Sequence, residues 1–414
     1  MVAPKLRFKE FDANWSLSSL GKMTTYFKGY AFKSESYKDS GIRVIRVSDL
    51  GRESIKTDND SIYIEANNAS AYENWIIKKD DIIITTVGSK PHLVDSAVGR
   101  PIYVKNNNEG LLNQNLLVLR PIDETVDSYF IYAQLLDKKY LTHIELIQRG
   151  NANQSNITVK DLQDFETYIT SKKEQTKIAS FLSTVDEKIS QLTQKHQLLS
   201  QYKQGMMQKL FSQQIRFKAD DGSEFGEWEE TTLGEIGTFK SGQGFPEQFQ
   251  GGKDGIPFFK VSDMNILGNE KIMKVANNYV NSEAITKMKA KVIDNEAIIF
   301  AKVGAAIFLE RKRLAKNFLI DNNMMAYLSN QKTNIMFLKQ FLDNIKLSKF
   351  VQVGALPSYN SSDLAIIPIS LPCLEEQTKI ANFLSAIDQK LEVVAQQIEQ
   401  AKTWKKGLLQ QMFI

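Results

Sequence analysis

Two matching stretches of sequence decide the fold. Residues 174–211 read EQTKIASFLSTVDEKISQLTQKHQLLSQYKQGMMQKLF, and residues 376–413 read EQTKIANFLSAIDQKLEVVAQQIEQAKTWKKGLLQQMF. At a constant offset of 202, 16 of the 38 positions are identical, whereas chance would give about 2. An internal repeat of this kind indicates a chain built from two copies of one unit.

Shorter matches extend the repeat over most of the chain. Their offset drifts between 202 and 216, as expected if the connecting loops differ in length. The segments between the matches differ strongly, so the copies share a framework but not the content of their middle segments. The matched anchors are Arg7-Phe8-Lys9 with Arg216-Phe217-Lys218, Trp15 with Trp228, Leu20-Gly21 with Leu233-Gly234, Val47-Ser48-Asp49 with Val261-Ser262-Asp263, Val87-Gly88 with Val303-Gly304, and Asp161-Leu162 with Asp363-Leu364.

Each 38-residue segment is predicted to be one long helix carrying a coiled-coil seam. Apolar residues recur at alternating steps of four and three, and Lys203 and Lys405 stand at the one omitted step of each segment. Because so narrow a stripe needs a partner, we expect the two helices to pair within the chain. The alternatives are packing of each helix on its own globular unit, or pairing between chains. The seam residues are Ile178, Leu182, Val185, Ile189, Leu192 and Leu199 in the first helix, and Ile380, Leu384, Ile387, Leu391, Val394 and Ile398 in the second.

The order of segments predicts the architecture. We expect an α+β fold with two mixed α/β domains separated by two long antiparallel helices, related by a pseudo-twofold axis. The predicted segments are a domain over 1–170, a helix over 171–213, a domain over 214–370 and a helix over 371–414. The opener Leu6-Arg7-Phe8 matches the residues that directly follow the first long helix. If the two copies are equivalent, the second long helix should end beside this opener, so the fold should be circular, with both termini close together. Runs of β-branched residues predict strands at Ile42–Val47, Asp81–Val87 and Ile366–Ile369, and helices are predicted over Tyr129–Ile147 and Met336–Val351.

Composition narrows the class of protein. The net charge of +4 neither requires nor excludes nucleic acid, and the single Cys373 suits a reducing cytoplasm. No stretch approaches the roughly 18 apolar residues of a membrane span. A P-loop, the Asp/Asn-Pro-Pro-aromatic signature of amino-methylating DNA methyltransferases and a zinc-ligand spacing are all absent from the sequence. We therefore expect a cytoplasmic protein without a catalytic centre, metal or cofactor of its own.

The repeated phrases carry a family resemblance. Glu174-Gln175-Thr176-Lys177-Ile178-Ala179 and Phe181-Leu182-Ser183 with Asp186, and their copies at 376–381, 383–385 and Asp388, resemble the conserved helical regions of type I restriction–modification specificity subunits. The openers Trp15 to Gly21 and Trp228 to Gly234 resemble the start of that family's target recognition domains. The resemblance covers essentially the whole chain.

The resemblance implies a division of labour. Each domain would be a target recognition domain that reads one half of a split site in double-stranded DNA, and the helices would fix the gap between the halves. The helices and their flanks would dock two modification subunits, which methylate adenine with S-adenosylmethionine. Restriction subunits that use ATP and Mg would join to cleave DNA. Because the middle segments differ, the two half-sites should differ too.

Polar loops are the candidate DNA contacts. Base edges are read by hydrogen-bonding side chains, and phosphates are held by cations. The segments Phe27–Lys33, 85–90 and 149–156 supply such residues in the first domain, and Phe239–Phe245, 302–304 and 352–360 are their counterparts in the second. For any single residue, a solvated turn is an equally good interpretation. The candidates are Lys28, Tyr30, Lys33, Thr86, Ser89, Lys90, Arg149, Asn151, Asn153, Gln154 and Asn156, then Lys240, Gln243, Lys302, Gln352, Ser358, Tyr359 and Asn360.

Two other functions compete with this interpretation. A stand-alone DNA-binding regulator would bind its site tightly without partners, and a coiled-coil assembly scaffold would show no sequence preference. A catalytic methyltransferase or nuclease is disfavoured by the missing motifs.

Overall fold

The computed structural model describes residues 2–57, 59–92, 97–150, 154–352 and 356–414, and it resolves into two compact units. Unit 1 contains Met1–Thr193 and Ala395–Ile414, and unit 2 contains Gln194–Val394. Each unit therefore holds one globular region together with parts of both long helices. The four-segment division drawn from the sequence remains a prediction. Within the described residues, no helix combines the length and the apolar character that crossing a membrane requires.

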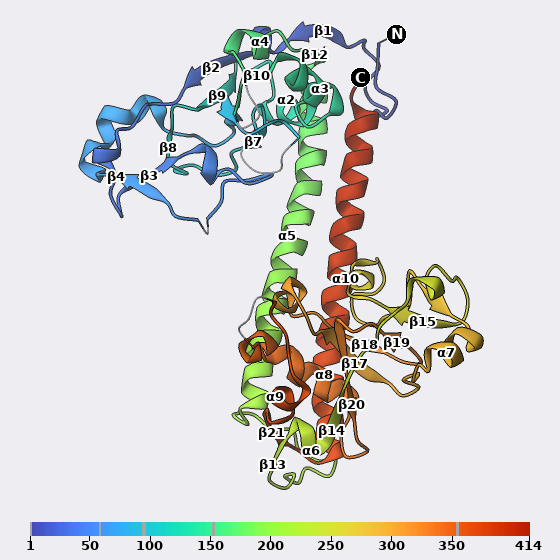
Figure 1. The fold of residues 1–414 in the computed structure, drawn as a ribbon. Helices are drawn as coiled ribbons and strands as arrows, with labels where there is room; N and C mark the ends of the chain where they lie inside the picture. The colour runs from blue at the N-terminus through green and yellow to red at the C-terminus, as the bar shows by residue number, and fades with distance from the viewer. Residues whose placement is uncertain (1, 58, 93–96, 151–153, 353–355) are drawn as a thin grey trace. The chain divides into compact units, whose positions relative to one another are not determined.

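Unit 1 is built on a four-stranded sheet of order β2-β9-β5-β7, of which β2, β9 and β7 are labelled in Figure 1. A three-stranded sheet, β4-β3-β8, packs on one side, and two small sheets complete the unit. The strands are β1 (Ser16–Ser19), β2 (Thr24–Lys28), β3 (Ile42–Ile45), β4 (Ile62–Ile64), β5 (Ile82–Thr85), β6 (Val87–Gly88), β7 (Pro101–Tyr103), β8 (Leu111–Leu112), β9 (Leu116–Pro121), β10 (Arg149–Gly150), β11 (Ser155–Asn156) and β12 (Glu166–Ile169). The helices are α1 (Leu20–Met23), α2 (Ser128–Gln134), α3 (Lys138–Ile147), α4 (Val159–Gln163) and the first part of α5 (Lys172–Phe211).

The central strands of unit 1 are apolar along their whole length because both faces of the sheet are covered. Ile82 and Ile84 of β5 face a core shared with α2 and α5, whereas Ile83 faces a second core shared with Ile45 and Leu112. Continuous apolar runs are typical of strands buried on both faces.

Unit 2 repeats this plan with a four-stranded sheet of order β14-β20-β17-β18 and a three-stranded sheet β16-β15-β19. Its strands are β13 (Glu229–Thr232), β14 (Gly237–Ser241), β15 (Ile256–Phe259), β16 (Tyr279–Val280), β17 (Ala297–Ala301), β18 (Lys312–Ala315), β19 (Leu319–Ile320), β20 (Met324–Ser329) and β21 (Pro368–Leu371). Its helices are α6 (Leu233–Ile236), α7 (Ser282–Met288), α8 (Ile335–Asn344), α9 (Ser361–Ala365) and the first part of α10 (Leu374–Met412).

The two long helices run antiparallel within each unit (Figure 1). In unit 1, Leu6 N donates to Gln411 O at 2.8 Å while the neighbouring Arg7 binds Glu174, so the end of α10 lies beside the start of α5. In unit 2, Arg216 binds Glu376 while Ile215 N donates to Lys209 O, so the start of α10 lies beside the end of α5. The predicted α+β fold with paired antiparallel helices and adjoining chain ends is confirmed.

The seam residues serve two contacts at once. Ten of the twelve are buried, and Leu199 and Leu391 are half-buried. In unit 1, Ile178 to Ile189 belong to one core that includes both Leu408 of α10 and Phe130 of the globular region. The helices therefore pair with each other and also pack on their own globular units, two arrangements that the sequence presented as alternatives.

Several predicted elements differ from the structure. The helix predicted over Met336–Val351 ends at Asn344, and Leu347–Phe350 forms a short 3-10 helix. The strand predicted over Asp81–Val87 is divided into β5 and β6. The helix predicted over Tyr129–Ile147 is divided into α2 and α3, because the Asp137 carboxylate accepts from Lys139 N and caps a new helix. The strand predicted over Ile42–Val47 stops at Ile45, because Asp49 folds back to accept from Arg46 N at 2.7 Å. The strand predicted at Ile366 begins at Pro368, because α9 occupies the preceding residues.

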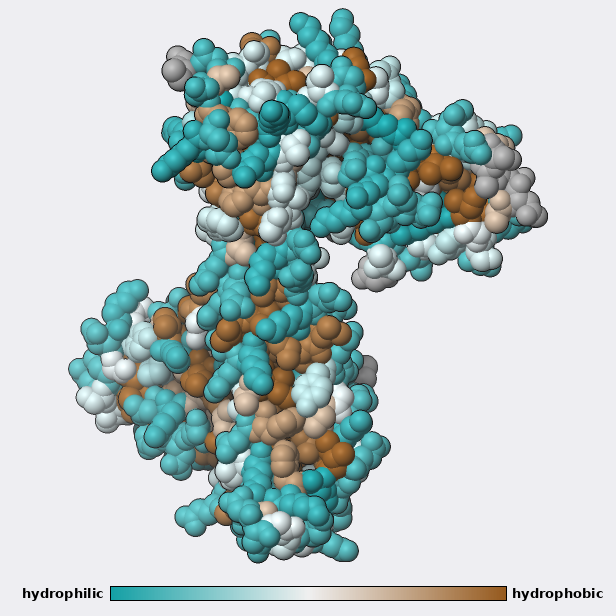
Figure 2. All heavy atoms as spheres, turned by 180° about the vertical axis from the view of Figure 1, so that it is seen from behind, coloured by the Kyte–Doolittle hydropathy of each residue, from teal (hydrophilic) through white to brown (hydrophobic). Residues whose placement is uncertain are grey.

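The molecular surface is predominantly hydrophilic on the face in Figure 2, where apolar residues form separate patches.

Candidate nucleic-acid interface

One edge of the main sheet in unit 1 collects the three predicted loops. Lys28 at the end of β2 pairs with Leu117, and Thr85 at the end of β5 pairs with Leu116, so the loops after both strands leave the sheet at the same edge. The small sheet β10-β11-β6 then joins the third loop to this edge, with Asn156 opposite Val87 and Arg149 opposite Asn156. Segments more than a hundred residues apart thus form one polar surface, here named the edge surface of unit 1.

Unit 2 builds the equivalent edge surface from equivalent bonds. Ser241 of β14 pairs with Met325, and Ala301 of β17 pairs with Met324. Lys302 follows, and its Nζ donates to Ser241 Oγ at 3.0 Å. Ser358 bridges to both Val303 and Gln352, as Asn156 does to Val87 and Arg149.

The structure corrects the alignment of the first loop by one residue. The sequence suggested that Phe27-Lys28-Gly29 matches Phe239-Lys240-Ser241, but strand pairing makes Lys28 equivalent to Ser241 and Gly29 equivalent to Gly242. The glycines fix this register, because a Cβ on Gly29 would lie 2.0 Å from Asn113 O and one on Gly242 would lie 1.9 Å from Asp321 O. Consequently Tyr30 corresponds to Gln243, and Thr86 corresponds to Lys302.

In this register, the lysine of one unit takes the position that a hydroxyl residue takes in the other. Unit 1 has Lys28 at the end of β2 and Thr86 directly after β5, whereas unit 2 has Ser241 at the end of β14 and Lys302 directly after β17. Both edge surfaces thus keep the same two functional groups in opposite order, which would present a different pattern to DNA.

The remaining candidates lie on or beside these edges with different exposures. Lys28, Lys33, Asn156, Lys240 and Asn360 are exposed, and Thr86, Ser89, Lys90, Gln243, Lys302 and Ser358 are half-buried. Arg149 binds Asp161 at 2.9 Å, and its equivalent Gln352 donates to Asp363 at 2.8 Å, so the repeated aspartates orient both side chains. Gln154 is exposed, whereas Asn151 and Asn153 lie outside the described residues.

Tyr359 was predicted to be a direct DNA contact, but the structure buries it in the core as a packing residue. Its side chain is 2% exposed, its ring packs edge-on against Phe300, and burial raises the pKa of its phenol. The equivalent residue is the buried Ile157, because Tyr359 N donates to Lys302 O as Ile157 N does to Thr86 O. Side chains alternate across a strand, so the residue after the exposed Asn156 or the half-buried Ser358 points into the core.

A duplicated joint at the start of each long helix was not predicted from the sequence. In unit 1, Arg7 donates through Nε and Nη2 to Glu174 at 2.6 and 2.8 Å. In unit 2, Arg216 donates to Glu376 at 3.1 and 2.7 Å, and Trp228 Nε1 adds a third bond at 3.0 Å. The Glu side chains are 1% and 0% exposed. Burial alone would raise the pKa of Glu174, but the hydrogen bonds from Arg7 and Thr170 outweigh it and lower that pKa.

The next residue of each helix completes the joint. Gln175 Oε1 accepts from Asp127 N, and its Nε2 donates to Thr125 O and Thr170 O. Gln377 makes the equivalent bonds to Asn334 N, Lys332 O and Pro372 O. The repeated Glu-Gln pair thereby ties each helix to the opener and to the loop before α2 or α8. The arginine and the Glu-Gln pair both recur in the sequence, but their recurrence does not show that they bind each other.

The lysines that interrupt the seam are paired with repeated aspartates. Lys405 binds Asp186 at 2.5 Å in unit 1, and Lys203 binds Asp388 at 2.8 Å in unit 2. Each aspartate also accepts from the globular region, through Tyr129 OH or Gln340 Nε2. Asp186 is 14% exposed and joins three elements, α2, α5 and α10.

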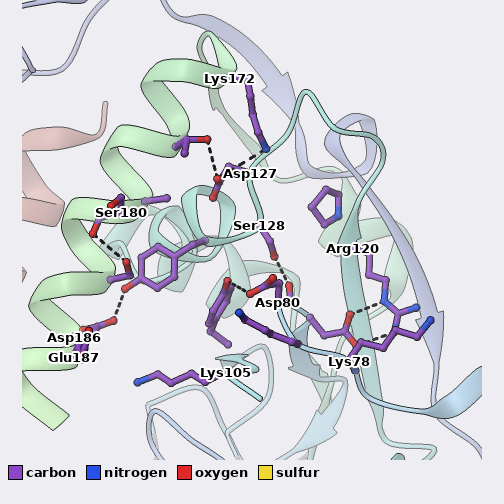
Figure 3. Close-up of a pocket in the computed structure, with 18 of the residues that line it drawn as sticks. Lys78, Asp80, Lys105, Arg120, Asp127, Ser128, Lys172, Ser180, Asp186 and Glu187 are labelled. Atoms are coloured by element: carbon purple, nitrogen blue, oxygen red, sulfur yellow. Dashed lines mark hydrogen bonds and ion pairs between the residues drawn. The ribbon is translucent and has the colours of Figure 1, made fainter. Parts of the chain in front are cut away.

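A cleft of about 1090 Å³ lies at the opposite end of the unit 1 sheet, against α5 (Figure 3). Most of its charged groups are already satisfied: Arg120 binds Asp81 at 2.5 Å, Tyr103 donates to Asp80, and Lys172 donates to Val126 O. Because β5 and β9 separate this cleft from Lys28 and Thr86, it is not part of the edge surface. No group of three or more His, Cys, Asp or Glu side chains in the described ranges could hold a metal ion.

Comparison with known proteins identifies the shared architecture. Residues 13–201 and 226–403 match the family described as type I restriction modification DNA specificity domain. The chain is 26% identical over 421 residues to the putative type I restriction enzyme MjaX specificity subunit of Methanocaldococcus jannaschii, covering 98% of this chain and 94% of that one. It is 24% identical over 363 residues to the MjaVIII specificity subunit of the same organism, covering 81% and 78%. The crystal structure of a type I restriction-modification system S subunit from M. genitalium has the same fold, with a TM-score of 0.60, 19% identity and coverage of 100% and 99%.

Proposed function

This chain belongs to the type I restriction modification DNA specificity family, and we propose that each of its units reads one half of a split DNA site. As a specificity subunit, it is the component of a type I restriction–modification system that recognises the DNA sequence. The observation that carries the proposal is the pair of edge surfaces, which share a backbone frame but differ in their side chains.

The difference between the edges makes the proposed site asymmetric. At equivalent positions unit 1 has Tyr30 and Arg149 where unit 2 has Gln243 and Gln352. A glutamine pairs with adenine edges and an arginine with guanine edges, so such exchanges alter which bases are favoured. The two half-sites would therefore carry different sequences.

The long helices would set the distance between the half-sites. α5 has 40 residues and α10 has 39, so each is about 60 Å long at 1.5 Å per residue. Two half-sites on one face of DNA are separated by about 34 Å or a multiple of it. The Asp186–Lys405 and Lys203–Asp388 pairs would fix the register of the helices and thereby the gap.

Two copies of one modification subunit would dock on features that the repeat duplicates. Trp404 is 54% exposed and Tyr202 is 51% exposed, and they stand at equivalent positions of the two helices. In unit 1 the Trp404 ring packs on Phe181, which packs on Phe8 of the opener. Exposed aromatic residues are enriched at protein interfaces, and a feature present twice suits two copies of one partner.

Chemistry would reside on the partners. S-adenosylmethionine would bind the modification subunits, and ATP with Mg would bind the restriction subunits, while this chain would act in the cytoplasm without catalysing either reaction. Replacing both Trp404 and Tyr202 with Ala should reduce recovery of the modification subunit in co-purification. The matched control replaces Lys402 and Gln201, which neighbour these residues, with Ala.

A domain exchange tests the central proposal. Residues 1–170 would be replaced with the same segment of a related specificity subunit, and methylated bases would be mapped in cells by single-molecule sequencing. One methylated half-site should change while the other half and the gap stay constant. An unchanged half-site would reject the assignment. Tight and specific DNA binding by the chain without partners would favour a stand-alone regulator instead.

A further inference from the structure

An open groove in unit 2 adjoins its edge surface and is lined by lysines. Its volume is about 470 Å³, and Lys240, Gln243, Lys289 and Lys291 line it together with apolar residues of β19. None of the described residues that line it is acidic. The three lysines form no ion pair within the described part of the chain, whereas Lys287, nearby on α7, binds Glu283 at 2.7 Å.

The same location in unit 1 is filled by aromatic rings. Ile64 and Val280 occupy the same strand position, and Ile77 and Ile293 make the same main-chain bond thirteen residues later. Counting from either pair makes Trp75 equivalent to Lys291 and Glu73 equivalent to Lys289. In unit 1 the Tyr30 ring lies 4.7 Å from the Trp75 ring, where unit 2 has Gln243 and Lys291 beside open space.

The backbone at Lys289 adds an independent observation. Lys289 ends α7 in the left-handed conformation, with φ 51° and ψ 36°, and its N–H donates to Thr286 O. Glycine or asparagine normally occupies this position because a Cβ is unfavourable there. A lysine therefore stands where helix stability alone would favour glycine, and strained residues of this kind cluster at functional sites.

We infer that this groove, formed by Lys240, Lys289 and Lys291, holds DNA backbone phosphates. Electrostatic attraction would then contribute more to the binding of the half-site by unit 2 than to the binding by unit 1. The inference rests on the proposed function, since it concerns how a DNA-reading unit holds its half-site. Unpaired lysines bind phosphates as point charges. Gln243 reaches both the groove and the edge surface, so a duplex read at the edge would bring its backbone to the lysines.

The consequence is a specific dependence on salt. Each phosphate contact contributes about 0.9 to the slope of log affinity against log salt concentration. Loss of two contacts should make that slope shallower by about 1.8. The ratio of wild-type affinity to variant affinity should therefore fall about tenfold when the salt concentration rises from about 50 to 200 mM. Base preference should stay the same, because phosphates carry no direct sequence information.

The experiment uses the full chain assembled with its modification subunits and a duplex containing the methylated site. The test variants are Lys289→Gln with Lys291→Gln, and Lys289→Gly with Lys291→Gln, and the control is Lys287→Gln. The glycine variant should keep or raise the melting temperature, so its weaker DNA binding cannot be assigned to unfolding. Both test variants should show the reduced slope with unchanged methylated sequences, while the control keeps the wild-type slope.

Two outcomes would overturn the inference. If both test variants keep the salt slope of the wild type, the groove holds no DNA phosphate. The same result is expected if the groove binds an acidic segment of a partner protein instead. An equal loss in the Lys287→Gln control would show that only overall charge matters. Failure of the wild-type complex to prefer its site would instead reject the proposed function itself.

Discussion

Replacing Glu376 with Gln should destabilise unit 2 far more than any surface change on the same helix. The carboxylate is fully buried and receives three hydrogen bonds, two from Arg216 and one from Trp228. Glutamine is nearly isosteric, but it removes the negative charge and turns one acceptor into a donor that faces the Arg216 guanidinium. The substitution therefore breaks the joint without creating a cavity.

The expected size follows from the burial of each partner. Removing one member of a buried ion pair costs about 3–5 kcal/mol because the other charge is left unpaired. Arg216 keeps 24% of its side chain exposed, so water can solvate it in part, and its bond to Gly226 O remains. We expect a loss near the lower limit, about 3 kcal/mol, which with a urea dependence of about 2 kcal/mol per molar lowers the midpoint by about 1.5 M.

Urea unfolding followed by circular dichroism and tryptophan fluorescence measures this loss. Glu375→Gln is the matched control, because it makes the same chemical change one residue earlier at an exposed position, and it should shift the midpoint very little. The double variant Arg216→Met with Glu376→Met should recover most of the loss, since an apolar pair can replace a buried ion pair. A Glu376→Gln midpoint equal to that of Glu375→Gln would refute the reasoning.

Three further predictions concern single residues of each unit. The pKa of Glu174 is lowered in the folded protein, so the stability that its carboxylate contributes is present above its unfolded pKa of about 4.3 and is lost as the pH falls through the folded pKa. The urea midpoint of Glu174→Gln should therefore depend less on pH between about pH 6 and 3 than the midpoint of the wild type. Lys405→Met should lower the free energy of unfolding by about 2 kcal/mol because it leaves Asp186 without its ion-pair partner. Adding Asp186→Leu should restore much of that stability. Two additive losses in the double-mutant cycle would contradict this pairing. Tyr359→Phe should leave the methylated sequence unchanged, whereas Tyr359→Ala should cost about 3–5 kcal/mol by opening a cavity in the core; a changed methylated sequence in the Phe variant would restore Tyr359 as a DNA contact.

The parts of the fold that depend on periodicity could be predicted from the sequence. The periodic segments 174–211 and 376–413 match the two long helices to within two residues at each end, since α5 covers Lys172–Phe211 and α10 covers Leu374–Met412. The position of the chain ends followed from the repeat, because the residues after α5 match those at the N-terminus. These features depend on local pattern and on chain order, which a single sequence contains in full.

The joint could not be predicted because it depends on distance in space. Arg7 and Glu174 are 167 residues apart, and a charged residue in an opener or in the first turn of a helix is ordinarily interpreted as surface. For the same reason the sequence did not predict that Lys405 and Tyr129 both bind Asp186. Only the tertiary fold shows that these repeated charges face each other.

The edge surfaces show that the structure brings together the loops that the sequence selected, but in a register that differs by one residue in the first loop. These loops are held by main-chain bonds, such as Thr86 N to Asn115 O at 2.9 Å and Lys302 N to Asn323 O at 2.7 Å. Bonds of this kind are independent of side-chain identity, so a lysine, a serine or a tyrosine can be exchanged at the edge with little cost to the fold. β2 and β14 have five residues each, and in each unit the glycine that follows lies against a backbone carbonyl, Asn113 O beside Gly29 and Asp321 O beside Gly242. The frame therefore leaves the side chains at the edge free to vary. The register is carried by the anchors before the loop, since the offset of 213 shared by Trp15 and Leu20-Gly21 pairs Lys28 with Ser241, whereas the match of Phe27 with Phe239 misaligned the loop by one residue.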